Sequence, residues 1–208
     1  MRKQISDNVI QRLPKYYRYL QELIDKNVTR VSSKTISEAL HLTASQVRQD
    51  LSLFGEFGQQ GYGYDTEHLK KCIRDILGLN EKHSAIIVGG GRIGQALANY
   101  KGFASENVEI KAVFDIETSH IKVAEEIKVL NYTELERFLS QNAIDIAIIS
   151  VQKELAEEVS KKVISCGIKS IWNFAPTDLY FPGDIVCENI NMSESLMRLI
   201  YRSKKIED

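Results

Sequence analysis

The stretch from Ser84 to Asp115 constrains the fold more than any other part of the chain. It begins with an apolar run, 85–88, continues with three consecutive glycines, and ends with a second apolar run, 108–114, directly before Asp115. Between the two runs, apolar residues recur at helical spacing: Ile93, Ala96, Leu97 and Tyr100. The order strand, tight turn, helix, strand and acidic residue is that of a βαβ unit. We therefore expect an α/β domain built on a parallel sheet.

Three glycines of this stretch have separate physical roles in a βαβ unit that binds a dinucleotide. Gly89 can adopt the dihedral angles of a sharp turn after the strand. Gly91 has no Cβ, so a pyrophosphate can approach the backbone, and Gly94 lets the helix pack closely against the strand. Unpaired N–H groups at the start of the helix then face the phosphates.

Asp115 lies 21 residues after Gly94, where a residue that binds the adenosine ribose is expected. The next residues, Ile116 and Glu117, include no arginine that could hold a 2′-phosphate, so the sequence favours NAD over NADP. A glycine-rich turn in a parallel sheet that binds no ligand has the same pattern, and this alternative stays open.

Composition narrows the class of protein. Of the 208 residues, 43% are hydrophobic and 26% are charged, as in soluble globular proteins. No apolar run approaches the length of a membrane-spanning helix and no apolar signal segment follows residues 1–4, so we expect a cytoplasmic protein. The cysteines Cys72, Cys166 and Cys187 are scattered, which predicts reduced thiols and no metal site.

The first part of the chain carries a second informative pattern. Residues 6–26 have apolar residues at helical spacing, interrupted by Pro14, which we expect to kink or break the helix. Ser33 can cap a helix to residue 40, and Thr43 can cap another over 44–53. On this second helix Val47 and Leu51 face inward. The outward residues are Ser45, Gln46, Arg48, Gln49 and Ser52.

Two short helices joined by a tight turn, with hydrogen-bonding residues on the outside of the second, are typical of a helix-turn-helix. Gln46 and Arg48 are residue types that pair with base edges, and Ser45 and Gln49 can hold phosphates or bases. The first 78 residues are mildly basic and the rest acidic, which permits a nucleic-acid partner without requiring one. An ordinary two-helix corner with a solvated polar side is the alternative.

Four glycines within residues 55–64 exclude a helix and predict a β-hairpin, a wing that follows the second helix. Asp65 then caps a helix to Leu77, whose inward residues are Leu69, Ile73, Ile76 and Leu77. Gly78 ends this helix, and we expect the domain boundary within 78–83.

After Asp115 the pattern continues as alternating helices and strands, which predicts a doubly wound parallel sheet. The expected helices are 123–127, 132–141 and 154–166, and the expected strands are 129–130, 144–151 and 168–174. Residues 180–191 are expected to be irregular. The final helix, 193–203, is apolar over most of its surface, which favours burial in a partner chain and hence a homodimer.

Taken together, these motifs resemble the Rex family of redox-sensing transcriptional repressors over almost the whole chain. The most specific motif spans 44–64, the second spans 88–100, and the third is 172–176 followed by 188–190. The resemblance implies a winged-helix DNA-binding domain over 1–79, a Rossmann NAD(H)-binding domain over 80–190, and a swapped C-terminal dimerisation helix over 191–208.

The family binds inverted-repeat operators in double-stranded DNA and is released by NADH, whereas NAD⁺ competes poorly as a releasing ligand. The resemblance implies DNA contacts from Ser45, Gln46, Arg48, Gln49, Gln59 and Gln60. It implies a pyrophosphate site at Gly89, Gly90, Gly91, Arg92, Ile93 and Gly94, with Asp115 on the adenosine ribose. It implies that the nicotinamide end is surrounded by Tyr100, Val151, Asn173, Phe174 and Ala175.

This sequence departs from the family pattern on the DNA side. Gln49 stands where the family usually has lysine, and Gln60 stands in the wing where a basic residue is common. The loss of two cations per subunit predicts weaker attraction to phosphates and a shallower salt dependence of DNA binding.

Departures also affect the nucleotide-dependent switch, for which the resemblance implies Arg18, Asn191 and Met192. Asn191 and Met192 stand in place of an Asp–aromatic pair, and Gln152 replaces a proline after the buried strand. Because Asn191 is neutral, it cannot form an ion pair with Arg18, so we expect a weaker or differently connected switch. Met192 is flexible and apolar and can still fill a pocket.

Two other functions remain as alternatives. An NAD-dependent oxidoreductase is disfavoured because no substrate domain follows the sheet and the four histidines lie away from the strand ends beyond Ser150. We therefore expect that the chain is not an enzyme. A module that binds another adenine nucleotide or coenzyme A without any DNA function is disfavoured by Asp115, which favours a free ribose diol.

Overall fold

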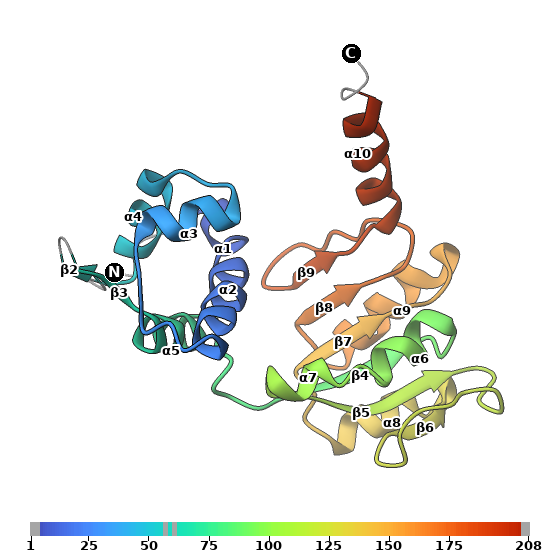
Figure 1. Cartoon of the computed structure of the whole chain (residues 1–208). Helices are drawn as coiled ribbons and strands as arrows, with labels where there is room; N and C mark the ends of the chain where they lie inside the picture. Colours follow the sequence, from blue (N-terminus) through green and yellow to red (C-terminus); the bar gives the residue numbers. More distant parts are fainter. Residues whose placement is uncertain (1–4, 56–57, 60–61, 205–208) are drawn as a thin grey trace. The chain divides into compact units, whose positions relative to one another are not determined.

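The structure is a computed structural model that describes residues 5–55, 58–59 and 62–204. The chain divides into two compact units, Met1–Glu81 and Lys82–Asp208 (Figure 1). The division lies within the stretch 78–83 where the boundary is expected. Gly78 has a φ of +75° there, a conformation that favours glycine after a helix.

The first unit is a helical cluster with a small antiparallel sheet. Its helices are α1 (Asp7–Ile10), α2 (Leu13–Asp25), α3 (Ser33–Leu40), α4 (Ala44–Ser52) and α5 (Thr66–Ile76). Its strands are β1 (Arg30–Val31), β2 (Gly58–Gln59) and β3 (Gly63–Asp65), in the order β1-β3-β2. The buried core includes Leu13, Tyr16, Leu20, Ile36, Val47, Leu51, Leu69 and Ile73.

Local sequence explains most element ends in this unit. The break expected near Pro14 occurs just before it, and Pro14 occupies the first turn of α2, where its missing N–H costs nothing. Thr43 and Gln46 form a capping box at the start of α4, and Asp65 caps α5. Two expectations were wrong: Ser32 rather than Ser33 caps α3, and Ile76 is exposed because α5 ends there.

The second unit contains a six-stranded, wholly parallel sheet in the order β6-β5-β4-β7-β8-β9. The strands are β4 (His83–Val88), β5 (Val108–Asp115), β6 (Lys128–Asn131), β7 (Ile146–Ile149), β8 (Ser170–Asn173) and β9 (Val186–Asn189). The helices are α6 (Arg92–Ala98), α7 (Gly102–Ser105), the 3₁₀ turn η1 (Tyr132–Glu134), α8 (Leu135–Gln141), α9 (Lys153–Ser165) and α10 (Met192–Lys204).

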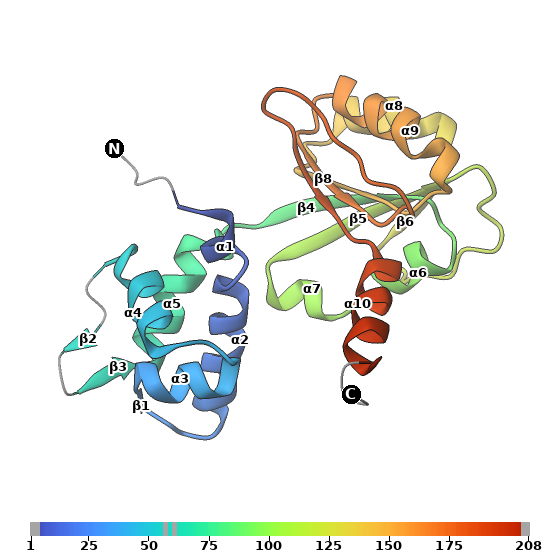
Figure 2. The same ribbon diagram turned by 90° about the horizontal axis from the view of Figure 1, so that it is seen from above.

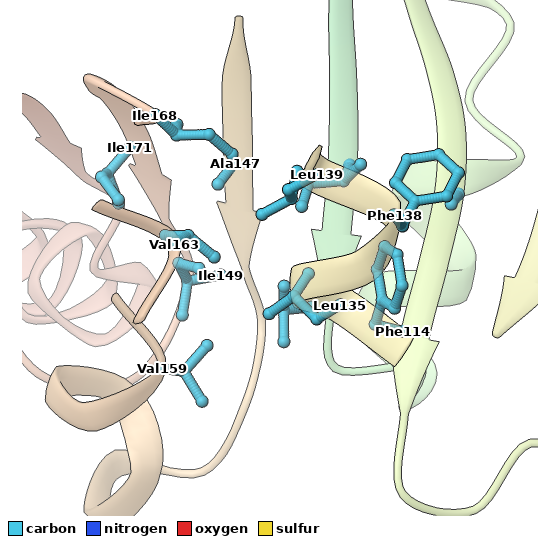
Figure 3. Packing of buried hydrophobic residues seen from close by; sticks show 13 residues of the cluster. Phe114, Leu135, Phe138, Leu139, Ala147, Ile149, Val159, Val163, Ile168 and Ile171 are labelled. Carbon is cyan, nitrogen blue, oxygen red and sulfur yellow. The ribbon is translucent and has the colours of Figure 1, made fainter. Parts of the chain in front are cut away.

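Helices cover both faces of this sheet, α8 and α9 on one and α6 and α7 on the other (Figure 2). Figure 3 shows side chains of α8 and α9, such as Leu135 and Val163, packed toward the strands with Phe114 and Ile149. The strand β4 lies in the middle and is buried on both faces, as its continuous apolar run predicts. The predicted α/β class with a doubly wound sheet is therefore confirmed.

Two expected elements of the second unit were wrong. Residues 123–127 form no helix; the stretch contains a single turn, in which the Ile127 N–H donates to the Ala124 carbonyl at 3.0 Å. Val123 and Ala124 of this stretch instead pack, partly buried, against the core on that face of the sheet. The stretch 180–191 contains β9, an edge strand whose half-exposed residues give no apolar run.

The helix α10 has no buried residue over its described length. Its exposed apolar residues are Met192, Leu196, Met197, Leu199, Ile200 and Tyr201. Among the residues that the structure describes, no helix is long and apolar enough to cross a membrane.

Candidate nucleotide and nucleic-acid sites

The glycine turn after β4 is fixed by close backbone contacts. Gly89 has a φ of +106°, and a Cβ on it would lie 2.6 Å from the Ser150 carbonyl oxygen. A Cβ on Gly94, in the first turn of α6, would lie 1.9 Å from the Gly89 carbonyl oxygen. The Ser150 hydroxyl donates to that same oxygen at 2.8 Å. The fold itself therefore requires glycine at positions 89 and 94.

Gly91 differs from these two residues. It has an extended conformation that any residue can adopt, and a Cβ on it would meet no heavy atom within 4 Å. The packing of the protein therefore does not require glycine at this position, and the open space beside the backbone is available to a ligand.

Asp115 ties this turn to the end of β5. Its Oδ2 accepts a hydrogen bond from the Gly90 N–H at 2.5 Å, and its Oδ1 accepts one from the Glu117 N–H at 3.1 Å. These two bonds fix the orientation of the carboxylate. Each oxygen retains a lone pair, so the group can still accept hydrogen bonds from a vicinal diol.

A cleft of about 470 Å³ opens where β4, β5 and β7 end, within the size range of small-molecule sites. Its lining residues are Val88, Gly89, Gly91, Phe114, Asp115, Ile116, Tyr132, Ser150, Val151, Gln152, Leu155, Glu158 and Val159. The walls are mainly apolar, and the two charged lining residues, Asp115 and Glu158, are both acidic. Such a lining disfavours a phosphate on the ribose.

The cleft thus brings together Gly89, Gly91, Asp115 and Val151 of the residues that the sequence singles out. Gly90 belongs to the same turn, through its bond to Asp115. Arg92 and Ile93 are exposed on the first turn of α6 and do not line the cleft. The apolar helical pattern expected here was only partly right, because Ile93, Ala96 and Tyr100 are exposed.

The other residues predicted at the nicotinamide end lie outside this cleft. Asn173 is 1% exposed, and its side chain accepts from the Ala175 N–H and donates to Asn189 Oδ1 and the Thr177 carbonyl. Its hydrogen-bonding groups therefore organise the loop after β8. The aromatic rings Tyr100, Phe103, Trp172 and Phe174 contact one another in sequence, with centroids 5.0, 5.8 and 4.8 Å apart.

Three residues that line the cleft, Tyr132, Leu155 and Glu158, were not predicted from the sequence. Leu155 and Glu158 are three residues apart on α9, a spacing that places both on one side of a helix that begins at a strand end. Tyr132 follows β6, and its hydroxyl is buried with no hydrogen-bond partner among the described residues. Burial raises the pKa of the Tyr132 hydroxyl, while Lys162 above its ring opposes that shift.

The outer side of α4 carries the predicted DNA-contacting residues. Ser45, Gln46, Arg48 and Gln49 are all exposed. The Gln46 carboxamide oxygen accepts from the Thr43 N–H at 3.0 Å, so its NH₂ group is the part available to donate to a base. Arg48 donates to the Ser33 hydroxyl at 3.2 Å. Of the wing residues, Gln59 has its backbone in β2, and Gln60 lies outside the described residues.

A buried ionic contact holds α4 against α2. Asp50 is 3% exposed and accepts two hydrogen bonds from Arg12, at 2.6 and 2.8 Å, and one from the Tyr16 hydroxyl at 2.6 Å. Burial raises the pKa of Asp50, but the bonds from Arg12 and Tyr16 outweigh it, so the pKa lies below its ordinary value. Burial, together with the bond to Asp50, raises the pKa of Tyr16.

The predicted switch residues belong to different units. Arg18 is exposed on α2 in the first unit. In the second unit, the Asn191 side chain accepts from the Glu194 N–H at 3.3 Å and so caps α10, and Met192 is exposed. No group of three or more His, Cys, Asp or Glu residues within the described part of the chain is arranged to hold a metal ion.

Comparison with known proteins identifies the family. The chain is 49% identical over 204 residues to the redox-sensing transcriptional repressor Rex of Clostridioides difficile (strain 630), covering 98% of this chain and 97% of that protein. This chain belongs to the Rex family of redox-sensing transcriptional repressors. A Rex protein of Clostridium botulinum (strain Hall) is 48% identical over 207 residues, covering 99% of both chains.

Two family models match separate parts of the chain. Residues 4–52 match the model described as "Putative DNA-binding protein N-terminus", and residues 80–177 match the model described as "CoA binding domain". The relatives are named repressors, in agreement with the expectation that the chain is not an enzyme.

Solved structures of the Rex-family repressor RSP are similar to this chain over nearly its whole length. RSP in complex with β-NAD⁺ and operator DNA has a TM-score of 0.91 and 42% identity, covering 99% of this chain and 95% of RSP. RSP in complex with β-NADH has a TM-score of 0.89 and 40% identity, covering 98% and 96%. The expected winged-helix and Rossmann-type fold is thereby confirmed.

Gly94→Ala should destabilise the second unit by about 1–3 kcal/mol, because its Cβ would meet the Gly89 backbone. Gly91→Ala is the matched control and should leave the free energy of unfolding within about 0.5 kcal/mol of the wild type. Urea denaturation followed by circular dichroism measures both. Equal stabilities of the two variants would contradict the packing argument.

Asp50→Asn should lower the free energy of unfolding of the first unit by about 2–4 kcal/mol, because it removes the charge that pairs with the partly buried Arg12. Since folding lowers the pKa of Asp50, its contribution is present above the ordinary carboxyl range and is lost as the pH falls through the folded pKa.

The wild type and Asp50→Asn should therefore keep their difference in stability in mild acid and converge only as the pH falls below the ordinary carboxyl range, in urea denaturation at matched ionic strength. Glu38→Gln, at an exposed carboxylate on α3, is the control and should change stability little at any pH. A constant difference between the wild type and Asp50→Asn at every pH would refute the assignment.

Proposed function

We propose that this chain is a homodimeric transcriptional repressor that binds an inverted-repeat operator in double-stranded DNA and is released by NADH. The cleft beside the glycine turn is the main evidence for this proposal. At Gly91 a phosphate can approach the backbone, the Asp115 carboxylate is held in one orientation, and the walls are mainly apolar. The similar repressor RSP also supports the proposal, because its structure has been solved in complex with β-NADH and in complex with β-NAD⁺ and operator DNA.

NADH would lie with its pyrophosphate against Gly89, Gly90 and Gly91 and its adenosine ribose on Asp115. The apolar side chains of Ile116 and Leu155 would flank the adenine. Arg92, Ile93 and Gly94 complete the turn into α6. The nicotinamide end would approach Tyr100, Val151, Asn173, Phe174 and Ala175. NADH is a regulatory ligand in this proposal and undergoes no reaction.

Coenzyme A fits the cleft less well than NADH. Its adenosine ribose carries a 3′-phosphate, whereas the cleft presents the carboxylates of Asp115 and Glu158 and no cation among the described residues that line it. A phosphate at that place would be repelled and left without a partner.

Operator recognition would use the exposed side of α4. Arg48 and the Gln46 NH₂ group would reach base edges in the major groove, and Ser45 and Gln49 would contact phosphates or bases. The wing, through Gln59 and Gln60, would contact the DNA beside them.

Two copies of the chain are needed for an inverted repeat, since each copy supplies one reading helix. The exposed apolar side of α10, which lies within the proposed dimerisation segment 191–208, is suited to burial against a second copy. Release requires that NADH bind more tightly to the arrangement of subunits that cannot span both half-sites. Arg18, Asn191 and Met192 would take part in this switch, and we place the protein in the cytoplasm.

Fluorescence anisotropy of a labelled inverted-repeat operator tests the proposal directly. NADH should release the operator at concentrations at which NAD⁺ does little, because only NAD⁺ carries a positive charge into the nicotinamide site. Gly91→Ala should stay folded and need at least about tenfold more NADH for release, because its Cβ occupies the space next to the pyrophosphate. Operator binding that is unchanged by NADH would contradict the proposal.

Gln49→Lys should restore one phosphate contact per subunit. The slope of log K against log salt for operator binding should then steepen by about 1.8 per dimer, or about 0.9 for each added contact. Gln141→Lys, which adds the same charge at the exposed end of α8, is the control. An unchanged slope for Gln49→Lys, or equal slopes for the two variants, would exclude position 49 from the DNA backbone contacts.

A further inference from the structure

We propose that adenine nucleotides without a nicotinamide ring, such as ADP, bind the cleft beside the glycine turn and oppose NADH without releasing the operator. The inference rests on the proposed function, because it concerns the same cleft. It adds a second class of ligand, so that operator release depends on the concentration of ADP as well as on that of NADH.

The cleft is matched to half of a dinucleotide. The turn at Gly89 and Gly91 suits a diphosphate, Asp115 suits a ribose diol, and the walls from Ile116 and Leu155 suit a flat apolar base. Of the five residues proposed for the nicotinamide end, Val151 lies at the edge shared with this cleft, whereas Tyr100, Asn173, Phe174 and Ala175 do not line it. The adenosine-diphosphate half of the site is therefore a separate cavity within one unit.

The protein's own hydrogen bonds and packing contacts hold this half-site. Two hydrogen bonds orient the Asp115 carboxylate, and contacts from Gly94 and Ser150 fix the Gly89 carbonyl. A ligand that enters a site held by the protein's own contacts loses little free energy to ordering the protein. Binding of the adenosine diphosphate group therefore does not depend on the nicotinamide ring.

A ligand shifts a conformational equilibrium only through its different affinities for the two states. NADH and NAD⁺ have the same adenosine diphosphate group and differ only in the nicotinamide ring. If the two redox forms are distinguished, the difference must arise at the ring, outside this cleft. ADP lacks the ring, so it occupies the cleft in either state of the repressor and only competes with NADH.

The test uses the full-length protein in two measurements. In the first, ADP is titrated calorimetrically into the protein without DNA, and inorganic pyrophosphate serves as a control for charge alone. In the second, NADH is titrated into the operator complex at increasing ADP, and release is followed by anisotropy. ADP at ten times its Kd should raise the NADH concentration needed for release about elevenfold.

ADP alone should leave the operator bound, pyrophosphate should not shift the NADH midpoint, and Gly91→Ala should weaken ADP and NADH together. The inference is overturned if ADP does not bind, if the NADH midpoint is independent of ADP, or if ADP itself releases the operator. Failure of NADH to release the operator in the absence of ADP would instead refute the proposed function, and calorimetry would still decide whether ADP binds.

Discussion

The close approach of Gly94 to the Gly89 carbonyl is the constraint on which the second unit depends. It sets how near α6 lies to the end of β4, and β4 is the buried strand from which the sheet extends to both sides. The same turn directs the Gly90 N–H to Asp115 on the neighbouring strand β5. One local packing requirement thus fixes both the phosphate-facing backbone and the ribose-facing carboxylate, and Gly91 is left open between them.

The first unit depends on an interaction of a different kind. Asp50 lies on the inner side of the helix whose outer side carries Gln46 and Arg48, and its bonds to Arg12 and Tyr16 hold α4 on α2. A buried charge tolerates few alternative positions, because any shift leaves it unpaired. The reading side of α4 is therefore presented by a specific polar contact as well as by the apolar core, and α2 also carries Arg18.

The sequence predicted those features that depend only on residues close together in the chain. The βαβ unit at 84–115 and the capped helices on either side of His41 depend on glycines, caps and apolar periodicity within short windows. The Asp50 contact escaped prediction because its partner Arg12 is 38 residues away. The strand β9 was missed because it is only half buried and so lacks a continuous apolar run. The cleft residues Leu155 and Glu158 were missed because the fold, and not the sequence spacing, brings α9 next to Asp115.

Thermodynamic linkage offers the most direct test of the central claim, that nucleotide binding in one unit controls operator binding by the other. If NADH weakens operator binding by some factor, the operator must weaken NADH binding by the same factor. Calorimetric titration of NADH into the protein, with and without saturating operator, measures that factor independently of release. The account predicts a lower NADH affinity on the operator complex, and equal affinities would contradict it.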